Sequence, residues 1–486
     1  MPPQAPLPRW RIFAIGLPLA TYAIAYVVFF PTTATVIDET AYLRQAAAFC
    51  RGEIRAIHDD PSTGAPRSVR VSDYQPGTSA LMAPFMFLGG WRSAYILGPL
   101  SLVTCIVIVV LWLRANGRSP VFALLVLAYP PMLVISRCAM SDLPSAALTT
   151  LGLFIFWHGA GRHWRWWLAA GFLAGASLAL RETNALLFAL FFLGAILRRE
   201  SGAWALVAGG LCGSVLRPLG SLLIFGEPFH LHPLYPGFSL GALPRNGPIY
   251  LIALTVLVPA GLPLTACYKG TRRPELILTV AAFLVLHLLY DYNGGTSGGL
   301  KQWVLGPRFF IPLVPLLAFA MAESVPRLCR DATARWTPVL AMLLAVGVTA
   351  EACIVTAVHA KWCRAQREIA ASLHRATSPS RPVISNVEAT GKFLNELYAP
   401  EIGPRTVVDF TQLTDLRLSL ILARYPTVDI AIVSRGDSEL WLKMAATNRA
   451  RVDHLRLRFD VTLMAANMIS SGERIEFYQV REKPTN

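Results

Sequence analysis

Long apolar runs separated by short polar segments dominate this sequence. Runs such as Ala123–Ile135, Leu148–Trp157 and Ala341–Thr349 contain no charged residue. A helix needs about 20 apolar residues to cross a bilayer, and somewhat fewer where helices shorten around a cavity. By this criterion the pattern predicts about eleven membrane-spanning helices. They are expected at residues 11–30, 92–113, 119–136, 143–160, 164–181, 183–198, 203–225, 248–267, 274–291, 307–325 and 337–358.

Basic residues cluster between these runs and predict how the chain is oriented. With eleven spans and a cytoplasmic N-terminus, every cluster falls on the cytoplasmic side, as the positive-inside rule requires. We therefore expect a multi-pass protein of the inner (plasma) membrane, whose first span is too long for a signal peptide and is not cleaved. The clusters are Arg9 and Arg11, Arg114 and Arg118, Arg162 and Arg165, Arg198 and Arg199, Lys269 with Arg272 and Arg273, and Arg327 with Arg330 and Arg335.

The segments on the opposite, periplasmic or extracellular side are longer and contain elements of their own. In the loop 31–91, the stretch Glu39–Ile54 places Tyr42 and other apolar residues on one face, with Arg44 and other basic residues elsewhere. This pattern predicts a helix that lies in the membrane interface. Thr78–Leu88 is apolar but too short to span, and is expected to be a second interfacial piece.

The tail after residue 358 has a different character, because strand and helix patterns alternate there. Together with the spans, this predicts an all-α, multi-span membrane domain over residues 1–358 and a small extracytoplasmic parallel α/β domain over residues 359–486. The tail strands are expected at Pro382–Asn386, Thr406–Phe410 and Val428–Ser434, and its helices at Glu388–Tyr398 and Gln412–Arg424.

Composition supports a membrane protein and argues against other classes. The chain is 54% hydrophobic and 15% charged, whereas soluble domains carry about 25% charged residues. Its net charge of +15 does not indicate a nucleic-acid partner, because the basic residues sit at span ends. The eight cysteines form no C-x-x-C pair, which argues against a metal or redox framework. Cys50 and Cys363 share a predicted side, so a disulfide between them is one option.

Five short polar segments at external span ends carry the candidate chemistry. Charged groups near hydrocarbon are costly, so each needs a partner or a function. The segments are Ile37–Tyr42, Asp73–Gly77, Ser136–Pro144, Leu180–Asn184 and Leu305–Phe310.

The first two segments each allow two interpretations. Asp38 could cap a helix, or it could be a carboxylate held at the membrane surface as a general base. The residues alone do not decide between these roles. Asp73–Gly77, with its proline and glycine, suits an ordinary turn when it is taken alone.

The three later segments carry arginines that could be structural. Arg137 could form a salt bridge with Asp142, which suits the start of a span. Arg181 could pair with its neighbour Glu182 at little gain in stability. Arg308 could snorkel to the interface, or it could clamp a phosphate arriving from the lipid side.

Taken together, the segments resemble the GT-C superfamily of polyprenyl-phosphate-dependent glycosyltransferases. The likeness is to the protein O-mannosyltransferase type and the lipid A aminoarabinose transferases, and it covers about residues 10–325. It rests on the order and topological side of several features. These are Asp38 and Glu39 with Tyr42, Tyr74–Gly77, Ser141 with Asp142, Arg181–Asn184, Phe225-Gly226-x-Pro228, and Gly306–Arg308.

The resemblance implies transfer of a sugar, with inversion, from a polyprenyl-phosphate donor to an extracytoplasmic glycan, lipid or protein. In such families the first acidic residue is the catalytic base and a late arginine holds the lipid phosphate. The implied catalytic residues are Asp38, Glu39 and Asp142, and the implied substrate-binding residues are Tyr42, Tyr74, Arg137, Arg181, Asn184 and Arg308. The aminoarabinose transferases also have a basic first-loop residue that finds no match beside Tyr74, which weakens an assignment to lipid A.

No cofactor follows with certainty from the sequence, and the metal requirement stays open. Asp38, Glu39 and Asp142 could gather oxygen ligands for a divalent cation. His230 and His232 form an H-x-H pair in an external loop. Such a pair, with nothing else of ligand spacing nearby, is more often ordinary than metal-binding.

Two other functions were weighed against glycosyl transfer. A transporter or lipid flippase would place charged residues deep in broken spans, often in two matching halves. Arg217, beside Pro218, is the main basic residue inside a span, and no halves correspond. If the protein were a non-catalytic scaffold, the predicted placement of Asp38, Asp142 and Arg308 on the same external side of the membrane would have no explanation.

Overall fold

The structure is a computed structural model that describes residues 8–59, 62–159, 163–230, 237–291, 303–328, 333–386, 407–434, 439–469 and 472–484. The chain divides into two compact units, which we name the helical unit and the sheet unit. The helical unit comprises Met1–Phe30, Tyr74–Phe85 and Ser93–His359. The sheet unit comprises Pro31–Asp73, Met86–Arg92 and Ala360–Asn486.

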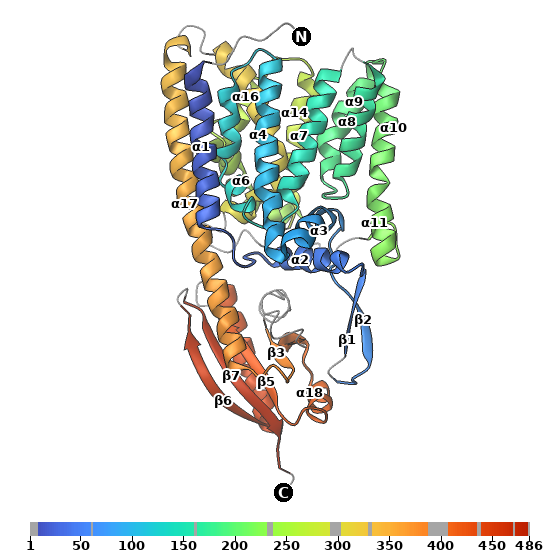
Figure 1. Cartoon of the computed structure of the whole chain (residues 1–486), viewed down its shortest axis with the longest axis vertical. Coiled ribbons are helices and arrows are strands. Elements are labelled where there is room, and N and C mark those ends of the chain that lie inside the picture. The colour runs from blue at the N-terminus through green and yellow to red at the C-terminus, as the bar shows by residue number, and fades with distance from the viewer. Residues whose placement is uncertain are drawn as a thin grey trace. The chain divides into compact units, whose positions relative to one another are not determined.

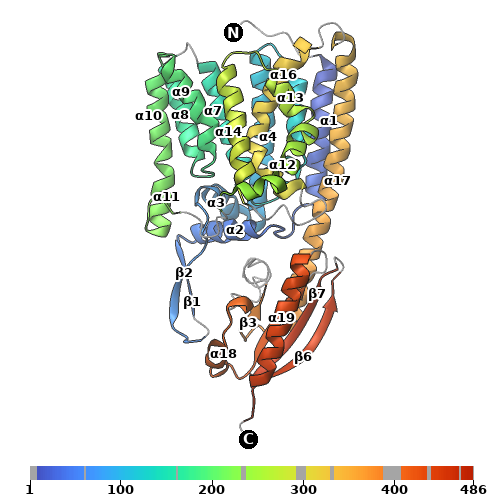
Figure 2. The same cartoon turned by 180° about the vertical axis from the view of Figure 1, so that it is seen from behind.

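Helices that run beside one another make up the helical unit (Figures 1 and 2), and three of them, Gly77–Gly89, Trp91–Ile96 and Thr333–Ala376, have part of their length in the sheet unit. In order they are α1 (Arg9–Val28), α3 (Gly77–Gly89), η1 (Trp91–Ile96), α4 (Leu97–Ala115), η2 (Pro120–Ala123), α5 (Leu124–Leu127), α6 (Pro130–Ile135), α7 (Asp142–Gly159), α8 (Trp164–Ser177), α9 (Asn184–Leu197), α10 (Ala203–Ser214), α11 (Leu216–Phe225), η3 (Leu240–Ala242), α12 (Leu243–Ile252), η4 (Ala253–Leu257), α13 (Gly261–Ala266), α14 (Arg273–Leu289), η6 (Pro307–Leu313), α16 (Val314–Leu328) and α17 (Thr333–Ala376).

Each of the predicted spans contains helix, which confirms the predicted all-α membrane fold but not the number of crossings. Among the described residues, six helices are long and apolar enough to cross a membrane. The segment 119–136 is instead broken into η2, α5 and α6, because Pro130 and Pro131 lack the N–H that would continue α5 and so start a new helix. The six helices are Arg9–Val28, Trp91–Ala115, Ala203–Phe225, Leu240–Leu257, Trp303–Leu328 and Thr337–Ala376.

Ion pairs join basic clusters that are distant in sequence. Glu323 binds Arg118 through two hydrogen bonds of 2.6 and 2.7 Å, and it also contacts Arg327 at 3.4 Å. Glu200 accepts from Arg272 at 2.6 Å and from Arg198 at 3.2 Å. The basic clusters at Arg118 and Arg327 are therefore joined through Glu323, and those at Arg198 and Arg272 through Glu200. All four clusters were predicted to lie on the cytoplasmic side.

Helices α8 and α10 pack backbone to backbone along a line of glycines. A methyl group at Gly171 or Gly175 would overlap backbone atoms of α10, and one at Gly209 or Gly213 would overlap backbone atoms of α8. In lipid there is little hydrophobic force between helices, so such close approach supplies the attraction. We call this contact the glycine seam.

The glycine seam leads to a first prediction. Gly209→Ala should lower the stability by about 1–3 kcal/mol, because the added methyl group would overlap the carbonyl oxygen of Leu168. Gly210→Ala is the matched control, since its methyl group would meet the edge of Phe192 at 3.2 Å and no overlapping backbone atom. Thermal unfolding in detergent measures both variants. Equal melting temperatures would contradict the packing.

The sheet unit contains several helices, a β-hairpin and a five-stranded sheet. The sheet order is β4-β3-β5-β7-β6, with β3 parallel to β4 and β5, and β7 antiparallel to β5 and β6. The elements are α2 (Ile37–Cys50), β1 (Arg55–Asp59), β2 (Pro66–Arg70), β3 (Val383–Ser385), β4 (Val407–Asp409), η8 (Phe410–Gln412), α18 (Asp415–Leu422), β5 (Val428–Ser434), α19 (Glu439–Arg458), β6 (Phe459–Met468) and β7 (Arg474–Glu482).

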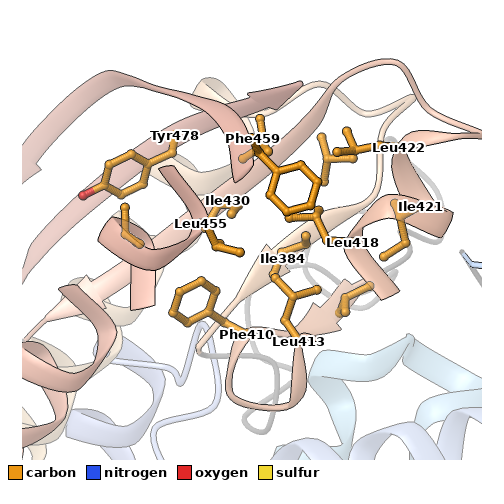
Figure 3. Packing of buried hydrophobic residues seen from close by; sticks show 14 of the residues in the cluster. Ile384, Phe410, Leu413, Leu418, Ile421, Leu422, Ile430, Leu455, Phe459 and Tyr478 are labelled. Atoms are coloured by element: carbon orange, nitrogen blue, oxygen red, sulfur yellow. The ribbon is translucent and has the colours of Figure 1, made fainter. Parts of the chain in front are cut away.

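Both faces of this sheet are covered by helices. On one face, Ile369, Ala370 and Leu373 of α17 pack against β5 and β7. On the other face, residues of α18 and α19 close a larger apolar core with Ile430 and other strand residues (Figure 3). Tyr478 lies at the edge of that core, where burial and its hydrogen bond to Glu476 raise the pKa of the phenol to about 12. It therefore stays protonated and is structural.

The expected small C-terminal α/β domain is confirmed, but its sheet is mixed rather than parallel. The three predicted strands exist, and the helix predicted at Gln412–Arg424 begins later, after the Thr414 cap, as α18. Strands β6 and β7 were missed. The exposed side of β6 carries apolar residues such as Leu463 and Met468, which hides its alternation. The helix predicted at Glu388–Tyr398 lies outside the described residues.

Two further differences concern the segments near the first loop. Between α2 and α3 the chain forms the β1–β2 hairpin, which the sequence did not suggest. The disulfide considered between Cys50 and Cys363 is not formed in the structure. The Cys363 Sγ instead donates to the carbonyl oxygen of Thr33 at 3.6 Å. The interfacial helices predicted in this region correspond to α2 and α3.

Candidate functional site

The acidic pair stands at the start of α2 in the sheet unit. The Glu39 carboxylate accepts from the backbone N–H groups of Thr35 at 2.7 Å and Val36 at 2.8 Å, and the side chain is fully buried. Glu39 thus caps the first turn, the role that the sequence allowed for Asp38. Asp38 is half-buried in the same turn, where the positive end of the helix dipole favours a carboxylate. Tyr42 follows one turn later and is buried.

In the helical unit, Asp142 and Arg181 form a buried ion pair. Asp142 is the first residue of α7 and is fully buried, and Arg181 lies in the turn before α9. The sequence allowed two other ion pairs, Arg137 with Asp142 and Arg181 with Glu182. Neither of these pairs is the one that forms. Tertiary packing sets the partners, because Glu182 instead binds Arg217 of α11, with Nε at 3.1 Å.

Asn184 joins the starts of α7 and α9. Its Nδ2 donates to Ser145 Oγ at 2.7 Å and to the Ser177 carbonyl oxygen at 3.0 Å. Two buried oxygens here, Asp142 Oδ2 and Asn184 Oδ1, have no hydrogen-bond partner among the described residues. Such orphaned acceptors are costly unless a ligand or water satisfies them. The cluster therefore has the capacity to accept hydrogen bonds from a bound molecule.

Arg308 and Arg181 lie near the same aromatic ring, that of Phe309. Both guanidinium carbons lie 5.3 Å from the centre of the Phe309 ring. Both residues are mostly buried, and η6, which carries Arg308, is fixed where Tyr129 donates to the Pro307 carbonyl oxygen at 2.6 Å. Two guanidinium groups at one ring, in a poorly solvated place, have the capacity to attract an anion. The sequence pointed to both arginines, but nothing in it signalled the linking role of Phe309.

The Tyr74–Gly77 segment is built into the helical unit through Gln75. Gln75 Nε2 donates to the His230 carbonyl oxygen at 3.0 Å, and its Oε1 accepts from Ser221 at 2.9 Å. A methyl group at Gly77 would overlap the carbonyl oxygen of Ala179, so only glycine fits there. The ordinary turn that the sequence allowed is therefore packed against α11 and the turn that follows α8, while Tyr74 itself is half-buried.

His230 forms a pair with Glu227 that the sequence did not indicate. Its Nδ1 lies 2.6 Å from the Glu227 carboxylate, and the imidazole stacks on Phe225 at 3.9 Å. His232 lies outside the described residues. In the part of the chain that the structure describes, no three His, Cys, Asp or Glu side chains gather as a metal site would require. Asp142 would also have to share its carboxylate between Arg181 and any cation.

The Asp142–Arg181 pair leads to a second prediction. Arg181→Met should lower the stability by about 3–5 kcal/mol, because it leaves the Asp142 carboxylate buried without its partner. Arg327→Met is the control, since Glu323 keeps Arg118 and the loss should stay below about 1 kcal/mol. Thermal unfolding in detergent measures both. A small effect of Arg181→Met would mean that the pair is open to water.

Comparison with known proteins adds structural relatives. No known protein family and no curated protein matches the sequence. ArnT from Cupriavidus metallidurans in the apo state aligns over 96% of this chain and 97% of its own, with a TM-score of 0.58 and 15% identity. The same protein bound to undecaprenyl phosphate aligns over 96% and 98%, with a TM-score of 0.57 and 13% identity.

A third solved structure is similar over nearly the whole of this chain. The Archaeoglobus fulgidus oligosaccharyltransferase tethered with an acceptor peptide aligns over 97% of this chain and 74% of its own, with a TM-score of 0.53 and 11% identity. Identities this low establish the fold alone. The chain shares its fold with ArnT and with the archaeal oligosaccharyltransferase, which agrees with the fold expected from its polar segments.

Proposed function

We propose that this protein is a membrane glycosyltransferase that moves a sugar from a polyprenyl-phosphate donor to an extracytoplasmic acceptor. The observation that carries this proposal is the placement of Arg181 and Arg308 on the Phe309 ring, next to buried Asp142. A polyprenyl phosphate presents a phosphate at the bilayer surface while its chain stays in lipid. Undecaprenyl phosphate is what the structurally similar ArnT binds.

In the proposed reaction the two arginines bind the donor phosphate and stabilise it as it leaves. An acceptor hydroxyl attacks the anomeric carbon from the face opposite the phosphate, so the configuration inverts. The bond from the anomeric carbon to the phosphate oxygen breaks, and its electron pair stays on the phosphate. Preorganised cations stabilise the charge that grows on this oxygen.

Asp38 is the proposed general base that takes the proton of the acceptor hydroxyl. It lies in the first turn of α2, where the helix N-terminus stabilises negative charge. Glu39, which caps the helix, holds this turn in place. Tyr42, Tyr74 and Asn184 are proposed to contact substrate.

A divalent cation is an optional addition to this scheme. Oxygen ligands for it would come from Asp38, Glu39 or Asp142, and it would supply further charge for the leaving phosphate. If such an ion is needed, EDTA should abolish transfer and Mg²⁺ or Mn²⁺ should restore it. An unchanged rate of transfer in EDTA would mean that the arginines alone stabilise the charge on the leaving phosphate.

The experiment that tests the function is transfer of labelled sugar from a purified polyprenyl-phosphate donor by the purified chain in detergent. We expect label to enter an envelope acceptor fraction and free polyprenyl phosphate to appear in equal amount. Detergent removes any sealed compartment, so a flippase would show no such product. Movement of donor across sealed vesicles without cleavage would overturn the proposal in favour of transport. The proposed site is extracytoplasmic.

A further inference from the structure

Ser136, Arg137 and Cys138 form a fully buried polar cluster that the proposed reaction does not use. Arg137 is 0% exposed. Its Nε donates to His359 Nδ1 of α17 at 3.2 Å, and its Nη2 donates to the carbonyl oxygen of Phe29 at the end of α1. An arginine among spans needs such partners, because an uncompensated charge there is very costly.

The neighbours of Arg137 complete the cluster. Cys138 Sγ lies 3.4 Å from His359 Nε2 and also 3.4 Å from the carbonyl oxygen of Val134. Because Arg137 Nε–H donates to Nδ1, the imidazole carries its hydrogen on Nε2, which donates to the sulfur. The thiol in turn donates to Val134. We call Arg137, Cys138, His359 and the Phe29 carbonyl the arginine hub.

The aromatic residues of α1 enclose the arginine hub. The Arg137 guanidinium lies 5.5 Å from the ring centre of Tyr26, and Tyr22 bonds to Ser136 Oγ. Tyr26 donates onward to the Tyr95 carbonyl oxygen at 2.8 Å. The hub therefore fixes three parts of the chain that are far apart in sequence.

Each of these parts leads to an element of the proposed site. Phe29 caps the end of α1, and the chain runs on from it to Asp38 in the first turn of α2. Arg137 precedes Asp142 by one short turn, and Tyr129, on the other side of α6, holds the carbonyl next to Arg308. His359 is the last helical-unit residue of α17, whose later turns form part of the sheet-unit core.

We infer that His359, acting through Arg137, is a positioning residue that fixes the turn from Ser136 to Asp142 against α1 and α17. The inference rests on the proposed function for its effect on rate. It assigns Arg137 to the interior of the protein rather than to substrate binding. Misplacing a reacting group by about 1 Å can cost about a hundredfold in rate.

The test compares two replacements of His359 that have similar size. His359→Leu removes the acceptor for Arg137, whereas His359→Asn keeps an oxygen near the position of Nδ1. We expect His359→Leu to lower kcat by about 10–100-fold while the donor KM stays within about threefold. His359→Asn should recover most of the loss. Equal losses in both variants, or a normal kcat in His359→Leu, would overturn the inference.

A double-mutant cycle and thiol labelling test the contacts of the arginine hub without measuring catalysis. If Arg137 and His359 act as one unit, Arg137→Met combined with His359→Leu should lower the melting temperature no further than the worse single change. Labelling of Cys138 by a maleimide, mapped on its peptide, should rise in His359→Leu. Additive melting losses or unchanged labelling would refute the hub.

These readouts separate the two proposals. A wild-type chain that transfers no sugar would refute the proposed function, while coupling and Cys138 protection would still test the arginine hub. Should His359→Leu fail to fold, Arg137→Lys keeps the charge but replaces the two guanidinium nitrogens that bind His359 and Phe29 with a single nitrogen. It should lower kcat in the same way, and a normal kcat would again overturn the inference.

Discussion

Asp38→Asn is expected to slow sugar transfer by at least about a hundredfold, since general-base assistance contributes about a hundredfold to ten-thousandfold. Asparagine is similar in size and cannot take a proton at neutral pH. The substitution should leave the fold unchanged, because the capping carboxylate of α2 belongs to Glu39. Initial rates of label transfer at saturating donor and acceptor measure the effect.

Glu39→Gln is the matched control for this prediction. Its amide oxygen can still accept from the N–H groups of Thr35 and Val36, although less strongly than the carboxylate. The variant should therefore lose some stability but keep more activity than Asp38→Asn. If Asp38→Asn transfers sugar at a near-normal rate with intact folding, Asp38 is not the base. A greater loss in Glu39→Gln would exchange the two roles.

Arg308→Met is expected to raise the donor KM by about 10–100-fold. A charge-assisted hydrogen bond contributes about 1.5–3 kcal/mol, and each 1.4 kcal/mol corresponds to about tenfold in affinity. Arg308→Lys should fall between wild type and methionine, because it keeps the charge but loses the two-pronged contact with phosphate. Initial rates across donor concentrations measure KM.

Arg165→Met is the control for the loss of one positive charge. Arg165 is exposed in the first turn of α8, at a span end predicted to be cytoplasmic. Its replacement should leave the donor KM unchanged. An equal rise in both variants would mean that net charge, and not the pair of cations on Phe309, attracts the donor.

Much of the helical unit could be predicted from the sequence. Apolar length sets where helices can cross lipid, and it placed helix in every expected span. It did not reveal where a span is broken, as at Pro130, or that α17 continues to Ala376 past its apolar part. In the sheet unit, Val428–Ser434 was predicted to the residue because its run is buried and mostly apolar, with Asp429 as the charged exception.

The candidate site was predictable in its residues but not in its contacts. Asp142, Arg181 and Arg308 stood out because charges are costly at span ends, and the structure gathers them around Phe309. Which charges pair depends on packing between helices, so the Glu182–Arg217 pair was hidden. For the same reason the sequence could not show that Glu39, one residue after Asp38, caps α2.

The glycine seam between α8 and α10 also bears on how the protein folds. Only α9 separates the two helices in the chain, so they can meet early in synthesis with little loss of chain entropy. Their contact consists of backbone against backbone and needs no side chain from a later span. The two helices, joined through α9, can associate by themselves in the bilayer and serve as a template on which α7 and α14 assemble.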